Sequence, residues 1–197
     1  MRVAIVGYGN QGKKREAVAG ADVVATVDPY NADASYRGIE ELDLDSFDVA
    51  LVCTSDSDKL RIIEYLLAAD KQVLVEKPLL ATEAGRFERV VDLAAKNGAT
   101  CYTAYNHRFE PQIAQLKNIL DTGDLGAVYS LRFFYGNGTA RDVRESVWRD
   151  QGMGVLADLG SHLLDLSSFL LGEQRNNFEA WSCNYFENEA LDHVVFA

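Results

Sequence analysis

The sequence predicts an α/β protein in two parts: a doubly wound parallel sheet at the N-terminus, followed by a smaller α+β domain with an antiparallel sheet. Three observations predict this fold. Short, β-rich apolar runs alternate with helical patterns over roughly the first 120 residues, a glycine-rich turn follows the first run, and strand-like runs succeed one another toward the C-terminus. Strand–helix alternation produces parallel sheets, whereas consecutive strands without helices produce antiparallel ones.

The expected parallel strands are apolar at consecutive positions, as in strands that are buried on both faces of a sheet. They are Val3–Val6, Val23–Val27, Val49–Cys53, Val73–Val75 and Thr100–Thr103. Two apolar stripes with i, i+3, i+4 spacing indicate helices between the later strands. The stripes are Leu60, Ile63 and Leu67, and then Phe87, Val90, Val91 and Ala94. We therefore expect a first domain over residues 1–122.

The pattern changes after residue 122, where turn-forming residues extend to Gly126. The elements expected beyond this turn are a strand at Val128–Tyr135, an arginine-bearing loop, a helix near Val155–Leu171, and strands at Phe178–Phe186 and His193–Ala197. We expect residues 123–197 to form a second domain, a three-stranded antiparallel sheet covered by one helix. Because its last strand would leave an open apolar edge, we expect this domain to be incomplete and the chain to be truncated.

Composition limits the kinds of partner that the protein can bind and indicates the cellular compartment in which it works. The 197 residues carry a formal net charge of −11, so neither nucleic acid nor an anionic membrane is expected as a partner. The apolar stretch after Met1 is too short for a signal peptide, and no later stretch approaches a membrane span. Cys53, Cys101 and Cys183 are widely spaced. Free thiols in a reducing compartment fit this spacing, and we expect a cytoplasmic protein.

The segment Gly7-Tyr8-Gly9-Asn10-Gln11-Gly12 matches G-x-G-x-x-G directly after the first strand. In this Rossmann-type context the first glycine permits the turn, the second lets the backbone approach a pyrophosphate, and the third packs helix against strand. Asp28 ends the second strand, where a carboxylate accepts hydrogen bonds from ribose hydroxyls and repels a 2′-phosphate. We expect NAD, in preference to NADP, to bind Gly7, Gly9, Asn10, Gln11, Gly12 and Asp28. The alternative is a plain strand–turn–helix in which Asp28 caps a turn, and the nearby Arg37 weakens the preference for NAD.

Glu76-Lys77-Pro78 lies at the end of the fourth expected strand. Ligands of open α/β sheets bind beyond the carboxyl ends of the strands. A lysine there can hydrogen-bond a substrate hydroxyl and stabilise the alkoxide that forms as hydride leaves. Pro78 restricts Lys77 to an extended conformation and so helps to fix its direction. From this tripeptide alone, a solvated Glu–Lys pair before a helix is equally consistent.

Taken together, these motifs resemble the glucose–fructose oxidoreductase / inositol dehydrogenase (Gfo/Idh/MocA) family. The resemblance runs in order along the whole chain and also includes Tyr105-Asn106-His107-Arg108-Phe109, Trp148-Arg149 and residues 152–165. It implies a two-domain NAD(P) oxidoreductase that acts on sugars, cyclitols or nucleotide-sugars and forms homo-oligomers through its C-terminal sheet. It also implies that Lys77 is the family's lysine, that Asp158 and His162 are its D-x-x-x-H pair, and that Thr54, Ser55, Glu76, Lys77 and Asn106 contact the cofactor. The segment from Thr54 to Lys59 departs from the Thr-Pro pair and following histidine that are frequent in the family.

Asp158, His162 and Asp165 have the i, i+4, i+7 spacing of one helix face. A separate stripe, which can pack on the sheet while the polar residues face a cleft, consists of Leu156, Leu159, Leu163, Leu166 and Leu170. Histidine titrates near neutral pH and can accept the hydroxyl proton, while a carboxylate orients it. The catalytic candidates are Lys77, Asp158 and His162. Without the resemblance, a solvated surface His–Asp pair would be preferred, and no metal site is expected because a third ligand is missing.

A loop that leads from Tyr135 to Trp148-Arg149 contains Arg141 and Arg144. These arginines can bind a carboxylate or diphosphate, or form salt bridges with neighbouring acids. His107 and Arg108 can reach the nicotinamide or the substrate, or can be buried hydrogen-bonding residues at the domain junction. The substrate candidates are Lys77, His107, Arg108, Arg141, Arg149, Asp158 and His162. Two alternative functions remain open: an NAD-dependent glycoside hydrolase that uses transient oxidation, and a non-catalytic NAD-sensing regulator.

Overall fold

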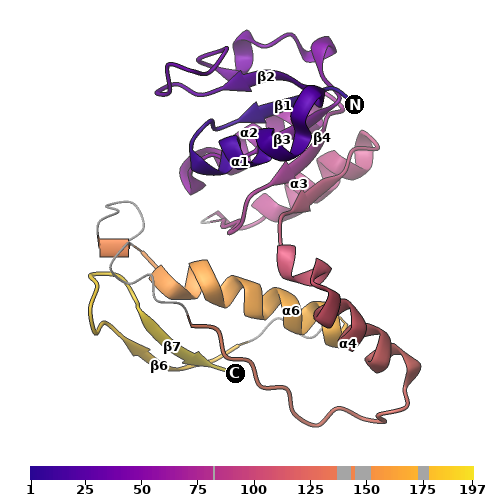
Figure 1. The fold of residues 1–197 in the computed structure, drawn as a ribbon, viewed down its shortest axis with the longest axis vertical. Helices are drawn as coiled ribbons and strands as arrows, with labels where there is room; N and C mark the ends of the chain where they lie inside the picture. Colours follow the sequence, from indigo (N-terminus) through magenta and orange to yellow (C-terminus); the bar gives the residue numbers. More distant parts are fainter. Residues whose placement is uncertain (82, 137–142, 145–151, 173–177) are drawn as a thin grey trace. The chain divides into compact units, whose positions relative to one another are not determined.

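The computed structural model describes residues 1–81, 83–136, 143–144, 152–172 and 178–197 (Figure 1). The chain divides into two compact units, Met1–Ala104 and Tyr105–Ala197. This division lies earlier than the boundary that we expected at residue 122. The reason is that the 3₁₀ helix η4 (Asn106–Phe109) and helix α4 (Pro111–Thr122) both contact helix α6 (Ser161–Leu171) of the second unit.

Five parallel strands form the sheet of the N-terminal unit, in the order β2-β1-β3-β4-β5. They are β1 (Val3–Val6), β2 (Val23–Val27), β3 (Val49–Val52), β4 (Gln72–Val75) and β5 (Cys101–Thr103). Val3 lies opposite Val23 of β2 on one side and Val49 of β3 on the other. The predicted doubly wound sheet is confirmed. Because the chain winds from β1 first to one side and then to the other, β1 ends at the position where ligands of such sheets bind.

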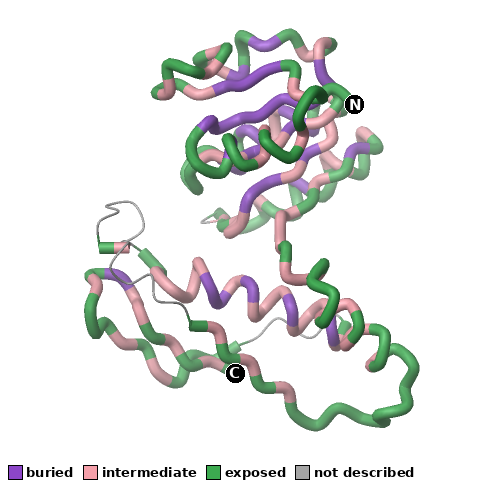
Figure 2. Tube along the Cα trace, viewed as in Figure 1, coloured by how far each residue is buried: buried purple, intermediate pink, exposed green. Residues whose placement is uncertain are grey.

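Helices α1 (Asn10–Ala19) and α2 (Asp56–Ala68) pack on this sheet, and helix α3 (Arg86–Lys96) packs against α2. The predicted α2 stripe is confirmed, since Leu60, Ile63 and Leu67 are all buried. The core of the unit extends from the middle strands to α2, as the purple segments of Figure 2 show. Its largest fully buried side chains are Phe47, Ile5, Ile63, Leu66, Leu67, Val52 and Val75.

The predicted α3 stripe was wrong at two of its four positions. Val90 is buried, but Phe87 and Val91 are exposed, at 42% and 64%. The inward face consists of Val90, Leu93 and Ala94. Arg86 at the start of α3 donates to Glu64 of α2, with Nε 3.0 Å from Oε1 and Nη2 3.2 Å from Oε2. This partly buried ion pair holds α3 in a rotation that the apolar spacing alone does not reveal.

In the C-terminal unit, a π-helical turn, η5 (Leu156–Gly160), continues into α6. Strands β6 (Ala180–Asn184) and β7 (His193–Phe196) pair antiparallel, with Ser182 opposite Val195. The predicted helix and the last two predicted strands are therefore confirmed. Leu159, Leu166 and Leu170 of the leucine stripe are buried.

The strand predicted at Val128–Tyr135 was wrong, because residues 127–136 form no strand. Tyr129 and Phe134 are 97% and 94% exposed. A strand exists only where a partner completes its ladder of hydrogen bonds, and among the described residues of this unit only β6 and β7 pair. The described antiparallel sheet thus has two strands rather than three. No helix in the described part of the chain is both long and apolar enough to span a membrane.

Candidate functional site

The glycine loop lies between β1 and α1, at the carboxyl edge of the parallel sheet. Gly7 has φ +94°, and a Cβ there would lie 2.6 Å from the carbonyl carbon of Cys53. A Cβ on Gly12 would lie 2.2 Å from the carbonyl oxygen of Gly7. The close packing of loop, helix and strand therefore requires both glycines.

Gly9 differs from its two neighbours in the motif. It precedes α1 with φ −86° and ψ −156°, and a Cβ built on it would meet no described atom within 4 Å. Packing within the protein therefore does not explain the missing side chain. Asn10 and Gln11 are exposed, and the first turn of α1 contains no acidic residue. The backbone amides and the positive end of the helix dipole are thus open to an anion, as the pyrophosphate of a dinucleotide requires.

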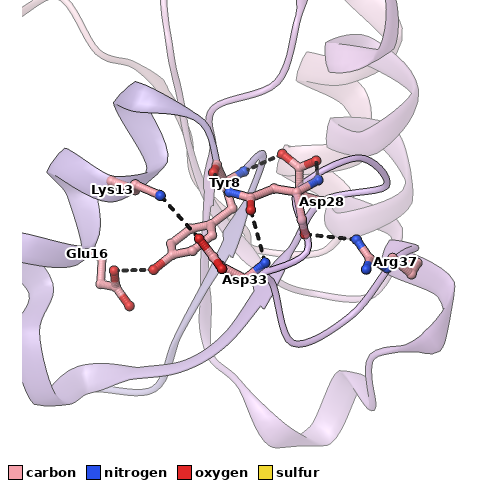
Figure 3. Close-up of polar contacts among 7 residues, drawn as sticks. Tyr8, Lys13, Glu16, Asp28, Asp33 and Arg37 are labelled. Atoms are coloured by element: carbon pink, nitrogen blue, oxygen red, sulfur yellow. Dashed lines mark hydrogen bonds and ion pairs between the residues drawn. The ribbon is translucent and has the colours of Figure 1, made fainter.

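Asp28 connects the end of β2 to the glycine loop (Figure 3). Its Oδ2 accepts from the backbone N–H of Tyr8 at 2.8 Å, and its Oδ1 accepts from the N–H groups of Tyr30 and Asn31 at 2.8 and 2.9 Å. Asn31 in turn donates from Nδ2 to the carbonyl oxygen of Tyr8 at 2.6 Å. Asp28 therefore caps the following turn and also faces the glycine loop. Three of its roughly four lone-pair positions are used within the protein.

The charge of Asp28 is stabilised by its surroundings. Burial alone would raise the pKa of this carboxyl group, but the amides of Asn31, Tyr30 and Tyr8 and the nearby charge of Arg37 hold the pKa below its usual value. Arg37 donates from Nη1 to the carbonyl oxygen of Asn31 at 2.8 Å. Asp28 is therefore an anionic acceptor at neutral pH, suited to ribose hydroxyls and opposed to a phosphate at the same place.

The Glu76-Lys77 segment follows β4 at the same sheet edge. The Glu76 side chain is 11% exposed and accepts hydrogen bonds from both Nε (2.7 Å) and Nη2 of Arg15. Arg15 belongs to α1, so this pair fixes the end of β4 to the helix that starts at the glycine loop. Glu76 thus contacts Arg15, which is not among the predicted site residues.

Lys59 of α2 holds the chain directly after Lys77. Its side chain is 3% exposed, and Nζ donates to Asp56 Oδ1 at 2.7 Å and to the carbonyl oxygen of Pro78 at 2.8 Å. The Lys77–Pro78 peptide bond is cis. A signal for Lys59 was present in the sequence, because it shares the buried face of α2 with Ile62, Ile63 and Leu66 at helical spacing.

Thr54 and Ser55 follow β3, next to the glycine loop. The Thr54 hydroxyl is buried and has no hydrogen-bond partner in the part of the chain that the structure describes. A Cβ on Gly7 would lie 2.7 Å from the Thr54 nitrogen, so the two segments are in close contact. Ser55 precedes α2 and is exposed. A buried hydroxyl group without a partner beside an anion-binding loop fits a site that a cofactor completes.

A cluster of rings surrounds His162 in the C-terminal unit. His162 is 5% exposed. Its ring centroid lies 4.5 Å from that of His107, 5.7 Å from Tyr105 and 6.0 Å from Tyr135. Asp158 lies in the π-helical turn before α6, which is wider than the regular helix that the i, i+4 spacing assumed. Such turns occur frequently at functional sites.

Arg108 and Asp165 form an ion pair beside this cluster. Nε of Arg108 lies 2.8 Å from Oδ2 of Asp165, Nη2 donates to Oδ1, and the guanidinium lies over the ring of Phe169. Arg108 therefore has the hydrogen-bonding role that was predicted as an alternative to substrate contact. Asn106 begins η4 and is exposed.

Of the arginines expected to bind substrate, Arg141 and Arg149 lie outside the described residues. Nη2 of Arg144 lies 3.6 Å from Oε2 of Glu187, and both side chains are exposed. Within the described ranges, no group of three or more His, Cys, Asp or Glu side chains is placed to hold a metal ion.

Comparison with known proteins assigns both units. Residues 1–105 match the model of an oxidoreductase family with an NAD-binding Rossmann fold, and residues 113–196 match the GFO/IDH/MocA C-terminal domain. The chain is 26% identical over 188 residues to inositol 2-dehydrogenase of Rhizobium meliloti, covering 88% of this chain and 56% of the relative. It is 32% identical over 136 residues to D-xylose 1-dehydrogenase [NADP(+)] of Haloarcula marismortui, covering 64% of this chain and 36% of the relative.

Among solved structures, the WlbA dehydrogenase from Bordetella pertussis, in complex with NADH and UDP-GlcNAcA, aligns with a TM-score of 0.80 at 19% identity. The alignment covers 99% of this chain and 65% of that one. At this identity the likeness shows the fold. The chain spans about half the length of the curated relatives that it matches, with 56% of the inositol dehydrogenase and 36% of the xylose dehydrogenase covered.

Proposed function

The chain belongs to the Gfo/Idh/MocA oxidoreductase family, and we propose that it transfers a hydride between NAD and a hydroxyl-bearing carbon of a sugar, cyclitol or nucleotide-sugar. The observation that carries the proposal is the carboxyl edge of the parallel sheet. There an open glycine loop follows β1, an anionic Asp28 bound to that loop follows β2, and Lys77 lies two residues after the end of β4. This edge offers an anion site, a ribose acceptor and an amine.

The preference for NAD over NADP rests on Asp28. Its lowered pKa keeps a negative charge where the 2′-phosphate of NADP would lie. Arg37 contacts the carbonyl oxygen of Asn31, so its guanidinium is already partly engaged. One relative is named for NADP(+), and the cofactor choice of this chain is therefore argued from its own residues.

In the proposed chemistry, the bound nicotinamide supplies the hydride acceptor. Lys77 hydrogen-bonds the reacting oxygen and stabilises its developing negative charge, while His162 accepts the hydroxyl proton. Asp158 orients the histidine and stabilises its cation. Substrate contact is also proposed for His107, Arg108, Arg141 and Arg149, and Arg108 is bonded to Asp165 in the structure.

We further propose a cytoplasmic location and assembly of copies of the chain through the C-terminal sheet. Cys53, Cys101 and Cys183 are all free thiols in the structure, as is typical of proteins from a reducing compartment. In the sheet, Trp181 of β6 and Val195 of β7 are 68% and 41% exposed. Exposed large apolar side chains of this kind are typical of interfaces.

Lys77→Ala tests the proposed function, assayed as NADH formation with a panel of sugars, inositols and nucleotide-sugars. We expect the turnover to fall by about a hundredfold or more while the dissociation constant of NAD is nearly unchanged. Lys71→Ala, which precedes β4 at the opposite end of the strand, is the matched control and should retain turnover. Equal loss of NAD binding and turnover in Lys77→Ala would contradict the role of the lysine. Sugar release from a glycoside without accumulation of NADH would favour a hydrolase instead.

A further inference from the structure

We propose that His107 and Glu110 form a proton relay that carries to solvent the proton that His162 takes from the substrate. The inference rests on the proposed dehydrogenase function and adds to it a path for the proton. All the residues involved belong to the C-terminal unit, Tyr105–Ala197.

The need for a relay follows from the burial of His162. Its exposed fraction is 5%, so water has little direct access to its ring. A histidine that gains a proton in each turnover must lose it again before the next one. The ring centroid of His107 is 4.5 Å away, with 69° between the ring planes, and it is the nearest of the three ring contacts described for His162.

His107 has the hydrogen-bond arrangement of a proton acceptor. Its Nδ1 is bonded to Oε1 of Glu110. Because a carboxylate can only accept, Nδ1 carries the hydrogen and the lone pair of the neutral ring lies on Nε2. Nε2 is buried and has no hydrogen-bond partner among the described residues. Glu110 is 47% exposed and connects the pair to water.

Other titratable and charged groups surround the two imidazoles. Tyr105 directly precedes η4, and the Arg108–Asp165 pair joins η4 to α6. Asp158 lies on η5, and Tyr135 contacts both rings. Burial, with the charge of Asp165, raises the pKa of Tyr105, so this phenol stays protonated at neutral pH. Nε and Nη2 of Arg108 both donate hydrogen bonds to the carboxylate of Asp165. His107 contacts His162 and has both features that a relay requires. Its Nε2 can accept a proton, and its Nδ1 is bonded to the carboxylate of Glu110, which is near solvent.

The step balances without a further reactant. An N–H bond of the His162 imidazolium breaks, and an N–H bond forms at Nε2 of His107. The N–H bond at Nδ1 of His107 then breaks, and an O–H bond forms on Glu110, which releases the proton to water. No electrons leave the three groups. In the direction of substrate reduction the same path runs inward.

The contact between the two rings can be tested without a substrate, because the chain has only three histidines. We would follow the imidazole signals by NMR between pH 4 and 9 in the wild type, His107→Gln and His193→Gln. Two imidazolium rings in contact repel each other, so His107→Gln should raise the apparent pKa of His162 by about 0.5 unit or more. His193 lies on β7 beside Asn184, and His193→Gln should leave the His162 titration unchanged. Identical His162 curves in the wild type and His107→Gln would overturn the relay.

The transfer itself is tested on the full chain by NADH formation with the best substrate of the panel. His107→Gln and Glu110→Gln should each lower kcat by about tenfold with little change in KM, and added imidazole should partly restore His107→Gln. An unchanged kcat and pH profile in both variants would overturn the proposal. If the wild type forms no NADH with any substrate, the proposed function fails, whereas the NMR titration still decides whether the two rings are coupled.

Discussion

The guanidinium of Arg108 donates to both carboxylate oxygens of Asp165, 57 residues further along the chain, with Nε 2.8 Å from Oδ2. The side chain of Asp165 is 6% exposed and that of Arg108 is 29% exposed. The pair joins η4 to α6 and holds the segment that carries His107 against the helix that carries His162. Two parallel hydrogen bonds of this kind fix the orientation of the two side chains as well as the distance between them.

Removal of one partner should therefore destabilise the C-terminal unit. Asp165→Ala removes both hydrogen bonds that the partly buried guanidinium of Arg108 donates to Asp165, and we expect the free energy of unfolding to fall by about 2 to 4 kcal/mol. Both tryptophans, Trp148 and Trp181, belong to this unit, so urea denaturation followed by tryptophan fluorescence reports on it. Lys117→Ala removes the more exposed Lys117–Asp121 pair and should cost less than about 1 kcal/mol. Equal effects of the two substitutions would contradict a structural role for Arg108 and Asp165.

Substitutions at Gly9 and Gly12 should separate the contribution of the glycine loop to folding from its contribution to cofactor binding. Gly9→Val places a side chain where no described atom lies, so the melting temperature should stay near that of the wild type. NAD should bind about tenfold more weakly or worse, because the side chain occupies the approach to the pyrophosphate. Gly12→Ala should instead lower the melting temperature, since its Cβ would lie 2.2 Å from the Gly7 carbonyl oxygen. Calorimetry with NAD and thermal denaturation distinguish the two effects, and wild-type affinity in Gly9→Val would argue against cofactor binding at this loop.

The N-terminal unit should lose stability in acid through Asp48. The side chain of Arg2 donates to this carboxylate, and so does the backbone N–H of Arg2, at 3.0 Å. These bonds lower the pKa of Asp48 to about 2 against an ordinary value of 3.8. A lowered folded-state pKa gives stability that is present above the unfolded value and is lost as the pH falls from about 4 toward 2.

Asp48→Asn removes this titration, so its stability should depend less on pH below about 4 than that of the wild type. Arg2→Ala removes the side-chain hydrogen bonds that lower the pKa of Asp48 but keeps the backbone N–H donor, so it should reduce the pH dependence in the same range in part. Urea denaturation followed by far-ultraviolet circular dichroism at several pH values measures both. A wild-type pH dependence in the two variants would exclude this pair as a source of acid sensitivity.

Features of the fold and site that depend on local chemistry were predicted from the sequence. The five parallel strands could be predicted because each is apolar at consecutive positions, and the glycine loop because G-x-G-x-x-G stands directly between a strand and a helix. Asp28 could be placed beside that loop because β2 always neighbours β1 in this topology.

The features that escaped prediction depend on partners distant in sequence. The rotation of α3 is set by Arg86 with Glu64 of α2, and the position of Glu76 by Arg15 of α1. The segment at Val128–Tyr135 has the composition of a strand, but composition does not supply a pairing partner. Ion pairs between elements leave no periodic pattern in the sequence. Lys59, whose ion pair lies within α2, could be noticed because it is a charged residue on an apolar helix face.

Lys59 provides the last test, because it contacts the chain directly after the proposed catalytic lysine. In Lys59→Met the carbonyl oxygen of Pro78 loses its 2.8 Å hydrogen bond, while the long apolar side chain still fills the buried position. We expect Lys77 to become less well oriented, so that kcat falls by about tenfold with little change in KM or in the affinity for NAD.

Lys59→Arg retains a donor for Pro78 and should recover part of kcat, which a purely space-filling role would not predict. Lys96→Met at the exposed end of α3 should keep wild-type kinetics. Lys59→Met removes the donor of the uncharged Pro78 carbonyl and of the half-exposed Asp56 carboxylate, so its stability should fall by no more than about 1 to 3 kcal/mol. An unchanged kcat in a folded Lys59→Met variant would separate Lys59 from catalysis and leave it a structural residue of α2.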